Sequence, residues 1–347
     1  MSLLRRQATQ YILGFSLSCV FALAISNALM DSLYSHEYDP LLSKYTYTPN
    51  TTYHKRQEGW ASTEIGKHNV NAIVDVKQIR GLKVAIWGDS EVEGFQVADD
   101  KKMAQQLTGL FRSANLKLTG FSVAHSGNAF ADYYFDIPKY ERIVQNISAH
   151  YIIVCNLNDA LPSPNSTRCK FIDQGHYLLV ESSCRPPQQE LLRRLSKWRL
   201  RIISYLYGKV ARINLRFKLG PTEKTDYRPD EISRYSKKEE AWEYMLTKIR
   251  EQSSKPITVV YCSYAPKIEK CGVLMSDPCE KDASTFASLC HRSGIGFVDL
   301  TKVFQDYYLK TLHFPRGFSN TTPSKGHLND EGHKLVAEAI FKSVLSR

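Results

Sequence analysis

From residue 83 to residue 345 the chain alternates short apolar runs with longer stretches of helical period. The runs of strand length are Val84 to Trp87, Leu116 to Val123, Tyr151 to Cys155, Ile257 to Cys262 and Gly296 to Leu300. The helix-like stretches are Asp99 to Leu116, Lys139 to Ser148, Thr301 to Leu309 and Asp330 to Leu345. Strands that alternate with helices predict a parallel sheet covered by helices on both faces. We therefore expect a three-layer α/β/α domain.

The first apolar run ends in a turn that could seat a nucleophile. Residues Lys83 to Phe95 read KVAIWGDSEVEGF, in which Gly88-Asp89-Ser90 closes the run. The pattern predicts a strand, a tight turn and a helix, with Ser90 at the carboxyl end of the strand. Open α/β sheets bind their ligands at that edge, where backbone N–H groups of the turn can face a negative charge. An ordinary turn has the same composition, so the motif has to be judged in its context.

Three more polar segments follow in the order that such a site needs. The second run leads into His125-Ser126-Gly127-Asn128 and the third into Asn156-Leu157-Asn158-Asp159. Just before and into the last helix stands His327-Leu328-Asn329-Asp330-Glu331-Gly332-His333. Three strand ends therefore carry Ser90, Gly127 and Asn158, and a histidine stands near the C-terminus.

These blocks resemble those of the SGNH (GDSL-type) hydrolase family, over residues 83 to 345. Gly88-Asp89-Ser90 with Gly94 is similar to its first block, Gly127 to its second, Asn158-Asp159 to its third and the His327 segment to its last. The resemblance implies a flavodoxin-like α/β/α fold and serine catalysis on acyl esters, in the manner of carbohydrate acetylesterases or O-acyltransferases. The chain departs from the family pattern at Glu91, where Leu is usual, at Asn156, where Gly is usual, and at Ser324, where an Asp is usual.

The resemblance assigns roles that the residue chemistry supports. Ser90 would be the nucleophile and His327 the general base, while the oxyanion would be bound by the N–H groups of Ser90 and Gly127 and the side-chain amide of Asn158. Asp89 and Ser324 would support them. We read His333 as structural, and His125 either lines the site or packs. We expect no cofactor and no metal, and no C-x-x-C pair suggests a zinc ribbon.

The missing Asp leaves the third member of a triad open. Ser324 could accept a hydrogen bond from the imidazole of His327, but it carries no charge to stabilise an imidazolium. We therefore expect a Ser90–His327 dyad, unless an acid from elsewhere in the chain, such as the insertion after the third strand, takes that place.

The N-terminus contains an uncharged stretch of membrane-spanning length. Tyr11 to Met30 carries no charge, follows Arg5 and Arg6, and precedes Asp31. This predicts one transmembrane helix with its N-terminus in the cytoplasm and the rest of the protein periplasmic or otherwise extracytoplasmic. A cleavable signal peptide is the alternative, because Ser26-Asn27-Ala28 offers small residues at a cleavage site.

Cysteines and sequons agree with export without proving it. Cys19 lies in the apolar segment and Cys155 in a buried run, which leaves an even set for up to three disulfides: Cys169, Cys184, Cys262, Cys271, Cys279 and Cys290. Four Asn-x-Ser/Thr sequons stand at Asn50, Asn146, Asn165 and Asn320. They would accept glycans only in a eukaryotic secretory route.

The rest of the chain divides by composition. We expect an anchor or signal segment at residues 1–30, a stalk and domain edge at 31–80, and the hydrolase-like domain at 81–347 with a helical insertion at about 161–255. Leu191 to Leu219 holds nine Lys or Arg, from Arg193 to Lys218, and no acid, within a net charge of +11. This basic stretch is either a solvated helix packed on the domain, or a contact for anionic lipid headgroups or an anionic polymer. Nucleic acid is not expected.

The sequence thus favours a membrane-anchored, serine-dependent esterase or acyl (acetyl) transferase that acts outside the cytoplasmic membrane on an acylated envelope carbohydrate or a small acyl ester. The alternative is a decayed SGNH-like domain that binds polysaccharide or an envelope partner. Labelling of Ser90 by a fluorophosphonate would separate the two.

Overall fold

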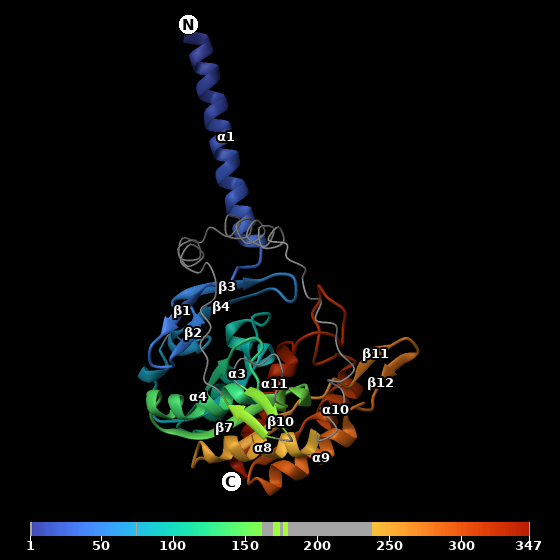
Figure 1. Ribbon diagram of the computed structural model, residues 1–347. Helices are drawn as coiled ribbons and strands as arrows, with labels where there is room; N and C mark the ends of the chain where they lie inside the picture. Colours follow the sequence, from blue (N-terminus) through green and yellow to red (C-terminus); the bar gives the residue numbers. More distant parts are fainter. Residues whose placement is uncertain (1, 74, 162–168, 174–175, 180–237, 347) are drawn as a thin grey trace.

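The protein is described here as a computed structural model covering residues 2–73, 75–161, 169–173, 176–179 and 238–346. A long N-terminal helix, α1 (Ser2–Leu29), projects from one end of a compact body, and the C-terminus lies at the opposite end (Figure 1). Within α1, residues Arg6–Ile25 have a mean hydropathy of 1.7 and are not buried against the body. Length and composition therefore fit a membrane span, as they would also fit a signal sequence.

The body is built on one parallel sheet of five strands. Their order across the sheet is β13-β10-β7-β5-β6, and every neighbouring pair is parallel. The strands are β5 (Leu82–Gly88), β6 (Leu118–Ala124), β7 (Ile147–Val154), β10 (Ile257–Tyr261) and β13 (Gly296–Asp299). Numbered along the chain, this is the flavodoxin-like order 2-1-3-4-5, whose topological switch lies between the first and third strands, β5 and β7. The predicted fold class is confirmed.

Side-chain alternation along the strands fills a core on each face. In β5, Ala85 and Trp87 belong to one cluster of buried residues, while Val84 and Ile86 belong to the other. All four are at most 1% exposed. Because both faces are covered, the strand reads as a continuous apolar run, and each buried aliphatic or aromatic side chain contributes roughly 1.5–3 kcal/mol.

Within the ranges that the structure describes, three helices cover each face of the sheet. Helices α4 (Phe130–Ile143), α8 (Lys238–Glu251) and α9 (Glu280–Arg292) supply the first cluster, and α3 (Met103–Ser113), α10 (Thr301–Thr311) and α11 (Asp330–Leu345) supply the second. Helix α11 has the predicted bounds. Helix α4 does not: it begins at Phe130, before the predicted stretch Lys139 to Ser148, and ends within that stretch at Ile143. It starts early because the Asp132 carboxylate accepts the Ala129 N–H at 2.9 Å. Residues 147 and 148 belong to β7.

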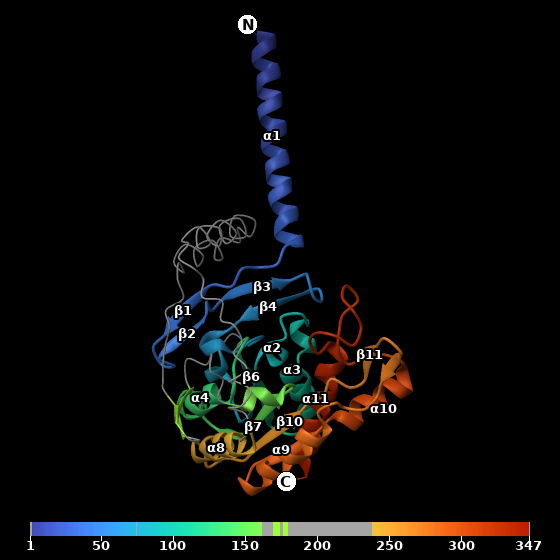
Figure 2. The same ribbon diagram turned by 45° about the vertical axis from the view of Figure 1, so that its right-hand side comes forward.

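Residues 31–80, expected to form a stalk and the edge of the domain, fold onto the body. They form two antiparallel hairpins, β1–β2 (His36–Asp39, Lys44–Tyr47) and β3–β4 (Thr51–Lys55, Ala61–Ile65), joined by the short 3-10 turn η1 (Lys67–Asn69) to the segment before β5. Tyr47, Tyr53, Ile65 and Phe95 form a separate buried cluster under them. Both views place β3 and β4 between α1 and the sheet (Figures 1 and 2). The hairpins therefore belong to the folded domain.

The predicted insertion is described only in part. It contains the hairpin β8–β9 (Cys169–Asp173, His176–Leu179) and α8, while the basic stretch Arg193–Lys218 and the sequon at Asn165 lie outside the described residues. A further hairpin, β11–β12 (Lys267–Glu269, Gly272–Leu274), follows β10, and short 3-10 turns lie at Val76–Gln78 and Asp99–Lys101.

The expected disulfides are not seen among the cysteines that the structure describes. Six cysteines there are free thiols, and four of these were among those expected to pair: Cys262, Cys271, Cys279 and Cys290. Cys262 and Cys290 are buried, whereas Cys271 and Cys279 are exposed. Burial raises the pKa of the Cys290 thiol to about 12, so this group stays a neutral thiol and behaves as a small core residue.

Candidate active site

Ser90 lies at the carboxyl end of β5, as predicted. The Asp89 carboxylate accepts the Glu91 N–H at 3.0 Å and caps the single-turn helix α2 (Ser90–Glu93). Gly94 ends that helix in the left-handed region, at φ 56°. Strand, cap and glycine thus hold Ser90 at the topological switch of the sheet, where doubly wound folds bind their ligands.

His327 reaches Ser90 from the loop before α11. Its Nε2 lies 2.9 Å from the Ser90 hydroxyl oxygen. The loop is fixed by Asn329, whose side-chain oxygen accepts the N–H groups of Glu331 and Gly332 at 3.1 Å each and caps α11. A serine hydroxyl and an imidazole at this distance form the geometry expected of a nucleophile and its base.

Glu58 is the acid behind His327, and the sequence did not reveal it. It lies in the turn between β3 and β4. One carboxylate oxygen lies 2.8 Å from His327 Nδ1, and the other accepts the His327 backbone N–H at 2.8 Å. The acid thus comes from elsewhere in the chain, which was the alternative to a dyad. It comes from the N-terminal hairpin and not from the insertion. The expectation that no acid faces His327 is wrong.

The β3–β4 turn is fastened to the loop that carries His327. The Asn320 side chain accepts the Gly59 N–H at 2.9 Å and donates to the carbonyls of Arg56 and Gly59 at 2.8 and 3.1 Å. Asn320 therefore holds the Glu58 turn in place.

Two glycines allow this close approach. Gly59 has φ +70°, and a Cβ there would lie 2.3 Å from the Gln96 carbonyl oxygen. Gly326 has φ +81°, and a Cβ there would lie 2.3 Å from a carboxylate oxygen of Glu58. A side chain at either position would meet both strain and a clash.

The charges at the site support this arrangement. Partial burial of Glu58 opposes its ionisation, but the hydrogen bonds from the His327 side chain and backbone outweigh burial and lower its pKa to about 2. Burial opposes protonation of His327, but the Glu58 hydrogen bond and the charges of Glu91, Glu58 and Asp89 outweigh it, so its pKa is raised. The anionic Glu58 favours the tautomer with a proton on Nδ1, which leaves Nε2 to accept the Ser90 proton.

Ser324 does not have the predicted role. Its hydroxyl accepts the Ile268 N–H at 2.8 Å, and the residue is 1% exposed with φ +67°. The imidazole faces Glu58 instead. Ser324 therefore ties its loop to β11, and any support that it gives His327 is indirect.

The three predicted oxyanion donors lie at the ends of neighbouring strands. Gly127 follows β6 with φ +84°, a conformation that favours glycine. The N–H of the preceding residue, Ser126, donates to the buried Glu93 carboxylate at 3.1 Å. Asn158 is exposed in the 3-10 turn η4 (Leu157–Ala160) after β7, where its N–H bonds the Asn156 side chain at 3.1 Å. Within the described part of the chain, the N–H groups of Ser90 and Gly127 and the Asn158 amide nitrogen make no hydrogen bond, so all three are available to a ligand.

The two other histidines considered from the sequence, His333 and His125, pack against neighbouring residues. His333 is fully buried and accepts the Met103 N–H at 3.1 Å, as expected of a structural histidine. His125 stacks on Tyr47 with ring centroids 4.6 Å apart, and its Nε2 lies 3.4 Å from that of His36. Burial lowers the pKa of His125 to about 4, so its ring is neutral near neutral pH.

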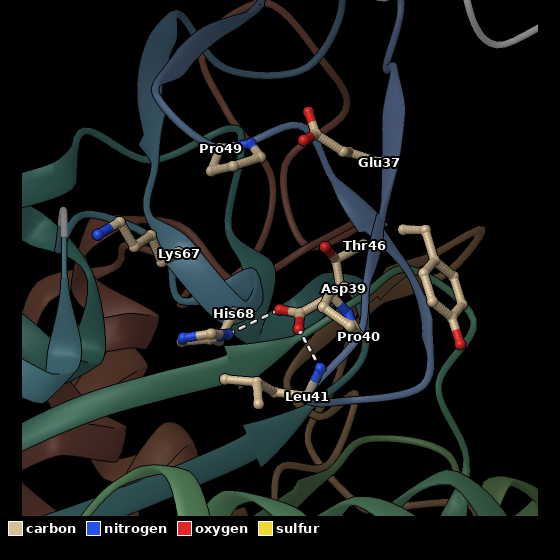
Figure 3. A pocket seen from close by; sticks show the side chains of 9 residues that line it. Glu37, Asp39, Pro40, Leu41, Thr46, Pro49, Lys67 and His68 are labelled. Atoms are coloured by element: carbon tan, nitrogen blue, oxygen red, sulfur yellow. Dashed lines mark hydrogen bonds and ion pairs between the residues drawn. The ribbon is translucent and has the colours of Figure 1, made fainter.

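A cavity elsewhere in the body does not coincide with these residues. It has a volume of about 250 Å³ and lies beside the β1–β2 hairpin, where His68 Nδ1 and the Asp39 carboxylate are 2.7 Å apart (Figure 3). None of the site residues lines it. In the described ranges no group of three or more His, Cys, Asp or Glu could hold a metal ion.

The fold and the side chains together define a three-layer α/β/α protein with a serine, a histidine and a glutamate in line at the carboxyl edge of its sheet. No protein-family model matches the chain, and no curated protein matches it. Among solved structures, an acetyl xylan esterase is similar with a TM-score of 0.40 and 15% identity, covering 76% of this chain and 100% of that one.

Two other solved structures are similar to this chain at the same level. A member of the lipolytic G-D-S-L family from Veillonella parvula has a TM-score of 0.38 and 12% identity, covering 77% of this chain and 100% of its own. The periplasmic domain of a lipopolysaccharide acetyltransferase from Salmonella serovar Paratyphi A has a TM-score of 0.38 and 10% identity, covering 78% and 86%. At this distance a likeness carries no information on substrate, which the residues around Ser90 have to supply.

Proposed function

We propose that this protein is a serine-dependent acyl-ester hydrolase or acyltransferase whose catalytic residues are Ser90, His327 and Glu58. The observation that carries the proposal is the continuous line of contacts from Ser90 Oγ through the imidazole to the Glu58 carboxylate, 2.9 and 2.8 Å long. A hydroxyl, a base within hydrogen-bond reach and an anion that orients the base are the parts that nucleophilic acyl transfer requires.

The geometry supports the following course of reaction. Ser90 Oγ attacks the ester carbonyl while its proton passes to His327 Nε2, and Glu58 stabilises the imidazolium through Nδ1. The tetrahedral intermediate collapses, the ester C–O bond breaks, and the leaving alcohol takes the proton from Nε2. Water or a second hydroxyl then attacks the acyl-enzyme with the same proton shuttle, which releases the acid or the new ester and restores Ser90.

The developing oxyanion would be bound by the N–H groups of Ser90 and Gly127 and the Asn158 amide. The two backbone donors are fixed at strand ends before the substrate arrives, so they need little reorganisation in the transition state. Asn158 is neutral and adds a donor without adding a permanent charge.

We further propose that α1 anchors the protein in the membrane with Ser90 outside the cytoplasm. The residues just after α1 hold the hairpin that carries Glu58: the Ser32 N–H donates to the His54 carbonyl at 2.9 Å, and the Asp31 carboxylate accepts the N–H groups of Arg56 and Gln57. The anchor end is thus connected directly to the active-site hairpin. This arrangement suits a substrate of the cell envelope, and an acylated carbohydrate is the class that we propose.

The alternative of a decayed binding domain was motivated by the absence of an acid behind His327. Glu58 removes that motive, so we do not propose it.

The test uses the full-length protein in detergent micelles with p-nitrophenyl acetate and a fluorophosphonate probe. Wild type is expected to turn over the ester and to be labelled, and Ser90→Ala to lose both while keeping its circular dichroism spectrum. Ser288→Ala, a change of the same kind at an exposed serine of α9, is the matched control and should behave as wild type. Turnover by Ser90→Ala equal to that of wild type would refute the assignment.

A further inference from the structure

Glu91, the residue after Ser90, is buried and binds two groups of the loop around His327. Its side chain is 7% exposed. One carboxylate oxygen accepts a hydrogen bond from Arg316 Nη1 at 2.7 Å, and the other accepts the Leu328 N–H at 2.8 Å. The Leu that is usual here in the family that this chain resembles could make neither bond, so this departure from the pattern introduces a contact between the nucleophile turn and the histidine loop.

Arg316 extends this contact to the other side of His327. Its side chain is 2% exposed and donates to the Gly326 carbonyl at 3.3 Å and to the Cys262 carbonyl at 3.0 Å. The guanidinium also lies over the Tyr264 ring, 4.3 Å from its centroid. Gly326 is therefore held through Arg316 and Leu328 is held by Glu91 directly. The two neighbours of His327 are both fixed to the residue that follows the nucleophile.

We propose that Glu91 is a positioning residue that holds the His327 imidazole against Ser90 and, with Glu58, stabilises the imidazolium formed when Ser90 attacks. This inference rests on the proposed function and adds a second anion to it. The charged groups around the imidazole are Glu58 from the hairpin, Asp89 and Glu91 from the nucleophile turn, and Arg316 from its own loop. The titratable group from α11 is His333, whose pKa burial lowers to about 3, so its ring is neutral near neutral pH.

A purely structural role for the pair would predict a different sequence. Burying two charges costs desolvation free energy, and a well-packed apolar pair of similar size is often as stable or more stable. The Glu91 charge also contributes to the raised pKa of His327, alongside Glu58. The Glu91–Arg316 pair therefore includes a charge that helps to raise the pKa of His327, which an apolar pair would not do.

The experiment measures kcat and KM for p-nitrophenyl acetate against pH in the full-length protein. In Glu91→Gln, the acid limb of kcat/KM should move to lower pH, because the imidazolium loses an anion, and kcat should fall about tenfold or more with KM little changed. Glu331→Gln is the matched control: the same change at a half-exposed carboxylate of α11 should leave both quantities near wild type.

Glu91→Gln leaves the buried Arg316 without its anion and could prevent folding. A second variant keeps the test decisive in that case. Glu91→Leu/Arg316→Met replaces the pair by apolar side chains. A melting temperature near that of wild type, together with a lowered kcat and an acid limb at lower pH, supports the proposal. Wild-type kcat and acid limb in the folded variants overturn it. If Ser90→Ala is inactive in that case, the proposed function stands and only the role of Glu91 fails.

Discussion

Replacing Glu58 by Gln tests the residue that the sequence did not reveal. The substitution keeps the size of the side chain and one acceptor for the His327 backbone N–H, but it removes the anion at Nδ1. The amide nitrogen would also favour the opposite imidazole tautomer, which places the proton on Nε2, where it blocks proton transfer from Ser90.

The expected loss can be estimated from the geometry. A 2.8 Å hydrogen bond between Nδ1 and the carboxylate places the charges roughly 4 Å apart, where their attraction is about 4 kcal/mol at an effective dielectric constant of about 20. The His327 and Glu58 side chains are 27% and 19% exposed, so water weakens the attraction somewhat. At about 1.4 kcal/mol per tenfold, the loss of imidazolium stabilisation lowers kcat by roughly 10²–10³, and the wrong tautomer brings the total toward 10⁴.

The assay is hydrolysis of p-nitrophenyl acetate by full-length protein over a range of pH. The pKa of His327 is raised in the wild type, so activity should fall as pH drops through a value above 6.5. In Glu58→Gln the pKa of His327 falls, and the remaining activity should extend to lower pH. Glu58→Asp keeps the charge at a shorter reach and should lose less activity. Turnover by Glu58→Gln within about tenfold of wild type, with an unmoved acid limb, would refute the reasoning.

Three further changes test the rest of the site and the anchor. Asn158→Ala should lower kcat by roughly 10²–10³ with little change in KM, and an effect on KM alone would make Asn158 a substrate contact instead. Ser324→Asp should not raise turnover, because Glu58 already faces the imidazole. The substitution should lower the melting temperature, since Ser324 is 1% exposed and its hydroxyl accepts the Ile268 N–H. Faster turnover would show that His327 lacks an acid. The protein should stay in the membrane fraction after a high-salt wash, because charge does not hold a spanning helix, whereas a soluble mature chain beginning near Leu29 would indicate a signal peptide.

The sequence by itself predicted a parallel sheet with helices on both faces, and the family resemblance of its four blocks indicated four candidate site positions. A parallel βα unit is a local pattern, in which an apolar run is followed by a turn and a helical period, so its strand ends can be found from neighbouring residues. Ser90, Gly127 and Asn158 follow strands, and His327 precedes the last helix, so each could be placed without knowing its contacts. The boundaries of α11 were also predictable, because Asn329 and the acids after it form a recognisable start signal.

Only the tertiary structure decided which side chains complete the site. Residues 31–80 are rich in Tyr, Thr and His and show no sustained helical period, which predicts a stalk and the domain edge but not the β3–β4 hairpin or its contacts. Glu58 stands 269 positions before His327, and Glu91 stands 225 positions before Arg316. Neither periodicity nor spacing encodes a contact between segments so far apart, since it depends on how the hairpin and the loop before α11 meet over the edge of the sheet. For the same reason Ser324, close to His327 in sequence, contacts β11 instead.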